Sequence, residues 1–117
     1  MKIAADTAGI LFLTELYGGK GTLTLHEFMG KEDLGGAGRR MGIMTIPQHA
    51  SIGPHTHTGE FESYYIMQGS GLYLDNDREY VLTRGDFVLC KDGDTHGISN
   101  PNPEDLVMYI VILNTIA

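Results

Sequence analysis

The chain has 117 residues and a formal net charge of −7, which comes from 15 acidic and 8 basic residues. A chain of this length fits one domain with one core, so we expect residues 1–117 to form a single domain. The acidic balance argues against nucleic acid as a partner, because phosphate binding needs clustered Lys and Arg.

Two features indicate where the protein works. Cys90 is the single cysteine and cannot form an internal disulfide, which favours a reducing compartment. The apolar run at residues 8–13 is too short for the core of a signal peptide or for a membrane span. We therefore expect a cytoplasmic protein without a membrane partner.

Short β-type segments follow one another along most of the chain. Residues 10–16 fit either a strand or a short helix. Further strands are predicted at residues 22–28, 40–46, 61–67, 71–74, 80–82, 86–90, 96–99 and 106–113. The last of these runs is apolar on both faces, so we expect it to be a central strand buried on both sides. This pattern predicts an all-β sandwich or barrel.

Two motifs carry the candidate chemistry. The first reads His-x-His-x4-Glu-x6-Gly, and the second reads Gly-x7-Gly-x2-His-x3-Asn. Their donor side chains are His55, His57, Glu62 and His96. Side chains at i and i+2 of a strand point to the same face, so both imidazoles of the first motif can approach one ion. Scattered structural histidines are the alternative, but here the spacing matches on both segments at once.

This donor set suits a divalent transition metal. Imidazole nitrogen binds Mn, Fe, Ni, Zn or Cu, and the carboxylate adds a hard anionic donor. One carboxylate leaves a divalent ion at about +1, which favours an anionic ligand in any open position. Four protein ligands on a six-coordinate ion leave room for water, substrate or dioxygen, so the pattern predicts an open centre.

The two motifs resemble the signature motifs of the cupin superfamily over about residues 40–113. The short separation of Gly69 and Gly85 is similar to that in small single-domain bacterial cupins. The resemblance implies a double-stranded β-helix, or jelly-roll barrel, that binds metal through the four donors above. It also implies a homodimer, and we expect residues 1–30 to pack on the barrel edge or on a second subunit.

Two positions depart from the family pattern. His49 stands where the first motif usually opens with Gly, and histidine tolerates positive φ better than most residues. Lys91 stands where the second motif usually has Pro, which removes a fixed φ from that turn. Neither departure affects a donor side chain.

Glu60 and Tyr64 are the candidates for acid–base chemistry. Both lie two residues from Glu62, so both can share its face. The alternatives are a solvated acid at the start of a strand for Glu60 and core packing for Tyr64. Arg39 or Arg40 could clamp a carboxylate substrate, although a solvated pair is the simpler interpretation.

Two function hypotheses from different classes follow. The first is a metal-dependent enzyme for a small anionic organic molecule, and the resemblance allows a dioxygenase, a decarboxylase or an isomerase. The second is a non-catalytic module that binds a metal or a small ligand as a sensor or store. The four intact ligand positions make a third alternative, a metal-free barrel, the weakest of the three.

Overall fold

The computed structural model describes residues 1–116 and consists almost entirely of antiparallel strands. The elements in chain order are β1 (Gly9–Thr14), η1 (Leu16–Gly18), β2 (Thr22–Gly30), β3 (Gly38–Ile46), β4 (Ser51–Thr56), β5 (Glu60–Gln68), β6 (Ser70–Asp75), β7 (Arg78–Thr83), β8 (Phe87–Cys90), β9 (Thr95–Ser99) and β10 (Leu106–Asn114). The predicted strands are therefore present. The ambiguous segment at residues 10–16 contributes β1 and the start of a short 3-10 turn.

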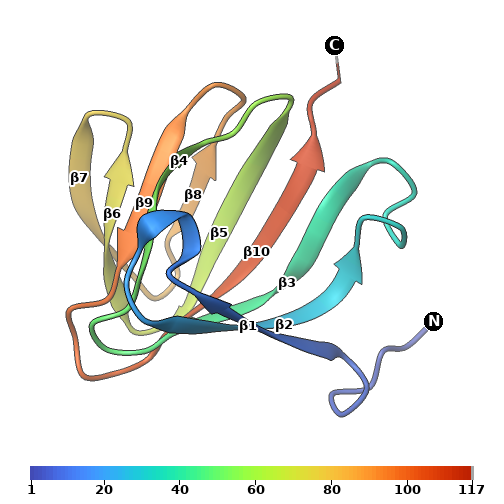
Figure 1. Ribbon diagram of the computed structural model, residues 1–117, viewed down its shortest axis with the longest axis horizontal. Coiled ribbons are helices and arrows are strands. Elements are labelled where there is room, and N and C mark those ends of the chain that lie inside the picture. The colour runs from blue at the N-terminus through green and yellow to red at the C-terminus, as the bar shows by residue number, and fades with distance from the viewer. Residues whose placement is uncertain (117) are drawn as a thin grey trace.

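The strands form two sheets that make the walls of a jelly-roll barrel (Figure 1). The six-stranded sheet has the order β1-β2-β3-β10-β5-β8, and the four-stranded sheet has the order β4-β9-β6-β7. The core lies between the sheets because alternate residues of each strand face inward. Leu23 and Leu25 of β2 are fully buried, for example, while Thr24 between them is only partly so.

β10 is central in the larger sheet, as predicted, but it is not buried on both sides. Met108 and Ile110 lie in the core, whereas Tyr109 and Val111 remain half-buried on the outer face. The expectation of two buried faces was therefore wrong for the single chain. The apolar residues on the outer face of β10 are thus partly exposed to solvent in the single chain.

The two departures from the family motifs are accommodated by the local backbone. His49 adopts the left-handed conformation with φ of 69°, as a glycine would. The turn that begins at Lys91 is closed by Asp94, whose carboxylate accepts the Lys91 N–H at 3.1 Å and whose own N–H donates to the Lys91 carbonyl at 2.9 Å. Two hydrogen bonds between Lys91 and Asp94 thus hold this turn in place of the fixed φ of proline.

Among residues 1–116 there is no helix long and apolar enough to cross a membrane.

Gly69 is a position where a side chain would be costly for two reasons. Its φ is +77°, and an added Cβ would lie 2.6 Å from the carbonyl oxygen of Asp105. Gly59 has nearly the same φ, +76°, with open space around it.

We predict that Gly59→Ala lowers the free energy of unfolding by about 1–2 kcal/mol through backbone strain alone. Gly69→Ala should lose about 1–3 kcal/mol more because of the added clash.

Urea unfolding measures the free energy of unfolding of each variant, and the two values can be compared directly when both variants have the same m-value. Equal losses of stability in Gly59→Ala and Gly69→Ala would contradict the predicted close approach to Asp105.

Candidate metal centre

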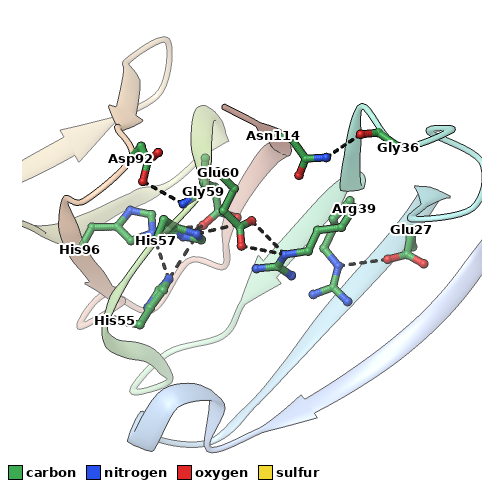
Figure 2. Close-up of polar contacts among 12 residues, drawn as sticks. Glu27, Gly36, Arg39, His55, His57, Gly59, Glu60, Asp92, His96 and Asn114 are labelled. Carbon is green, nitrogen blue, oxygen red and sulfur yellow. Dashed lines mark hydrogen bonds and ion pairs between the residues drawn. The ribbon is translucent and has the colours of Figure 1, made fainter. Parts of the chain in front are cut away.

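The four predicted donor side chains come together between the two sheets. His55 lies on β4 and His96 on β9, where the two are register partners, while Glu62 lies on β5 of the opposite sheet. His57 follows directly after β4, which ends at Thr56, so it reaches the cluster from a turn rather than from a strand. Figure 2 shows the imidazoles pointing toward one another.

The donor atoms are as close as ligands of one ion. His96 Nε2 lies 3.0 Å from His55 Nε2, 3.1 Å from His57 Nε2 and 3.1 Å from Glu62 Oε1. His57 Nε2 is 3.0 Å from Glu62 Oε1, and His55 Nε2 is 4.0 Å from the same oxygen. Bonds of about 2.1 Å to a common ion place neighbouring ligand atoms about 3 Å apart. The separations therefore fit a single metal ion.

The ring nitrogens that face away from the cluster form hydrogen bonds, and these bonds determine whether the nitrogens that face the cluster can bind a metal. His55 Nδ1 is 2.8 Å from the carbonyl oxygen of Gly53, which only accepts, so Nδ1 carries the proton and Nε2 keeps its lone pair. His96 Nδ1 lies 2.9 Å from the hydroxyl of Tyr73. Lone pairs from several rings and a carboxylate thus converge on one point, which is unfavourable without a proton or a cation.

The charge states of the cluster also suit a metal. Burial raises the pKa of Glu62, but the three neighbouring imidazoles outweigh this, and the pKa ends far below its usual value. Burial lowers the pKa of His96, and the nearby Glu62 carboxylate offsets this only in part. An ionised carboxylate and neutral imidazoles are the forms that bind metal.

Glu60 and Tyr64 lie beside the cluster in different ways. Glu60 pairs with Arg39 through both carboxylate oxygens, at 2.9 and 3.1 Å from Nε, and its Oε2 lies 3.7 Å from the outer nitrogen of His57 (Figure 2). Tyr64 is buried and stacks on the ring of His96, with centroids 5.1 Å apart. Burial and the charge of Glu62 raise the pKa of Tyr64 well above its usual value, so its phenol stays neutral.

A small cavity of about 30 Å³ adjoins His57 and Glu62. Arg39 and Arg40 contribute cationic side chains to its wall, and each forms an ion pair with a carboxylate, Glu60 and Glu27 respectively. Burial lowers the pKa of Arg39, yet the Glu60 carboxylate and the phenol of Tyr17 more than compensate and raise it overall. The cavity is therefore small, and its wall holds two guanidinium groups that are each paired with a carboxylate, together with the carboxylate of Glu62.

Sequence reasoning missed Tyr17 and Tyr73. Tyr73 lies on β6, where Gly71 and Tyr73 alternate inward, so its inward position could have been found from the period of the strand. Tyr17 comes from a segment without a motif, and only the fold brings it to the cavity.

Comparison with known proteins places the chain in a family. Residues 42–112 match the family model described as Cupin domain. The chain therefore belongs to the cupin domain family, which agrees with the resemblance of the two motifs and with the observed barrel.

Several known proteins are similar to this chain, and the matches cover different shares of its length. An oxalate-binding protein of Thermotoga maritima is 34% identical over 101 residues, which cover 86% of this chain and 84% of that protein. The crystal structure of a predicted oxalate decarboxylase from the same organism superimposes with a TM-score of 0.92 at 30% identity, covering 98% of this chain and 100% of that one. The transcriptional activator RhaR of Enterobacter sp. is 42% identical over 57 residues, 48% of this chain but only 20% of the activator.

We predict that Tyr73→Phe lowers metal affinity by about 10- to 100-fold, because His96 loses the hydrogen-bond acceptor that orients its ring. Tyr80→Phe is the matched control, since its hydroxyl donates to Asp75 at 2.7 Å and contacts no donor of the cluster. Competition with a chelator of known affinity measures the effect. Equal affinities of the two variants would show that Tyr73 does not support the centre.

Proposed function

We propose that the protein binds a divalent transition metal through His55, His57, Glu62 and His96, and through this ion a small dicarboxylate such as oxalate. The observation that carries the proposal is the convergence of four buried donor side chains beside a small cavity whose wall includes two arginines. The similarity to an oxalate-binding protein supports the choice of ligand. When bound, the metal supplies a Lewis acid that polarises carboxylate oxygen.

The two arginines of the cavity wall can orient an anion once the metal is bound. Arg39 and Arg40 form their ion pairs through Nε, at 2.9 and 3.0 Å. Each guanidinium group also has two terminal nitrogens, and such planar donors suit a carboxylate. A dicarboxylate can thus be held at one end by the ion and at the other by a guanidinium group.

The proposed site is tested first by metal content. Protein purified without chelator or affinity metal should hold a stoichiometric amount of Mn, Fe, Ni, Zn or Cu by elemental mass spectrometry, and His96→Ala should lose it. His26→Ala is the control, because His26 lies on β2 outside the cluster. In calorimetry, oxalate should bind only the metal-loaded protein. Metal retained by His96→Ala, or oxalate binding without metal, would contradict the proposal.

Catalytic turnover of the bound ligand is a separate and more specific part of the proposal. Tyr64 lines the cavity in which a metal-bound dicarboxylate would lie, and Glu60 is close to the outer nitrogen of His57, so these two residues remain our candidates for proton transfer. A decarboxylase would release carbon dioxide and formate from oxalate. If Glu60→Gln and Tyr64→Phe both leave such turnover unchanged, the assignment is wrong. If the loaded protein binds oxalate and releases nothing, the non-catalytic binding module is correct.

We also propose that the protein acts as a cytoplasmic homodimer. Its single cysteine suits a reducing compartment. A row of mainly apolar residues crosses all six strands of the larger sheet on its outer face, and its members are Ile10, His26, Ile43, Tyr109, Tyr65 and Phe87. Ile10 is 56% exposed, Tyr65 47% and Phe87 63%. Extended apolar surfaces of this kind are typical of protein interfaces.

Lysine residues introduced on the outer face of the larger sheet test this interface. The double variant Tyr65→Lys with Phe87→Lys should sediment as a monomer, because two buried ammonium groups would oppose packing of the sheet faces. Val81→Lys is the matched control, since Val81 is 62% exposed on β7 of the other sheet. Sedimentation velocity distinguishes the forms. A monomeric unmodified protein, or a double variant that stays dimeric, would contradict this interface.

A further inference from the structure

Tyr17 lies over the candidate metal centre, in the η1 turn between β1 and β2. Its ring stacks on the imidazole of His55, with centroids 4.0 Å apart and an interplanar angle of 12°. The residue is nevertheless half exposed. The ring therefore stands between one of the donor side chains and the solvent.

The backbone around Tyr17 is strained. Tyr17 and Glu15 both have a φ of 51°, in the left-handed region that residues other than glycine rarely occupy. Such a conformation persists only where its surroundings hold it, and it is concentrated at ligand sites. The turn is thus held in one particular place rather than left as a free connection.

β4 holds the turn in that place. A Cβ at Gly53 would collide with the Tyr17 carbonyl, so glycine allows the two backbones to approach. Ser51 adds two hydrogen bonds with Lys20, one to its hydroxyl and one from its N–H, each 2.9 Å long. Gly53 also accepts the Nδ1–H of His55. The same stretch of β4 therefore sets the positions of both stacked rings.

The ring of Tyr17 also forms part of the wall of the small cavity. Arg39 and Arg40 line this cavity as cations, and Met44 and Ile110 line it as core residues. Its volume is about 30 Å³, so even a small ligand would contact the wall. The buried core closes the inner side, so the half-exposed Tyr17 is the wall that decides how far a ligand extends outward.

We infer that Tyr17 is a specificity-determining residue whose ring caps the cavity and limits the ligand to a dicarboxylate of the length of oxalate. Malonate is longer by one methylene, which would have to enter the space of the Tyr17 ring. A tight pocket discriminates against one methylene by about 10- to 200-fold. This inference rests on the proposed function, because it concerns the ligand of the same site.

Calorimetric titration of the metal-loaded protein with oxalate and with malonate tests the inference. The unmodified protein should prefer oxalate by about tenfold or more. In Tyr17→Ala this preference should shrink to about twofold, mainly through stronger malonate binding, with metal content unchanged. Tyr17→Phe keeps the ring and should keep the preference. Val81→Ala, on the exposed face of β7, is the control and should behave like the unmodified protein.

The outcomes separate the two proposals. If the unmodified protein binds oxalate and Tyr17→Ala keeps its preference over malonate, the role of Tyr17 is refuted and the proposed function stands. If Tyr17→Phe loses the preference as Tyr17→Ala does, a cap formed by the ring is also refuted. If the metal-loaded unmodified protein binds neither ligand, both proposals fail.

Discussion

A buried carboxylate held against three imidazoles is the interaction on which the candidate centre depends. Glu62 belongs to the larger sheet, whereas His55 and His96 belong to the smaller one, so the cluster joins the two walls of the barrel. An ionised group in this position is costly unless it is compensated, and the converging lone pairs of the rings add repulsion. A cation resolves both problems at once. The polar interior is thus unfavourable for a plain barrel and favourable for a metal-binding one.

The rigidity of this cluster comes from its surroundings. His55 is oriented by a carbonyl of its own strand, and His96 by the hydroxyl of Tyr73 on β6, the strand that pairs with β9. Because these partners lie within the smaller sheet, both rings are fixed by the hydrogen-bonded ladder itself. The small four-stranded sheet therefore works as the frame that aims two imidazoles at the carboxylate of the opposite sheet.

Much of this arrangement could be predicted from the sequence, because it depends on local periodicity and spacing. The β-type segments predicted most of the strands, including the one that carries the buried Leu23 and Leu25, and the two motifs identified the four side chains that the fold brings together. Two features could not be predicted from the sequence, for physical reasons. The outer face of β10 is apolar, and a sequence does not distinguish burial by its own chain from burial by a partner. Tyr17 reaches the cavity only because β4 carries a glycine where the η1 turn crosses it.

Under the proposed function, the charges around the cavity make anion binding conditional on the metal. The whole chain is acidic, and such a surface does not attract a dianion. Within the cavity Arg39 is balanced by Glu60 and Arg40 by Glu27, which leaves the charge of Glu62 uncompensated. A divalent ion changes this balance from about −1 to about +1. Under the proposed function, the site would therefore repel a dicarboxylate before the metal enters and attract it afterwards, and the arginines would orient a ligand that only the ion recruits.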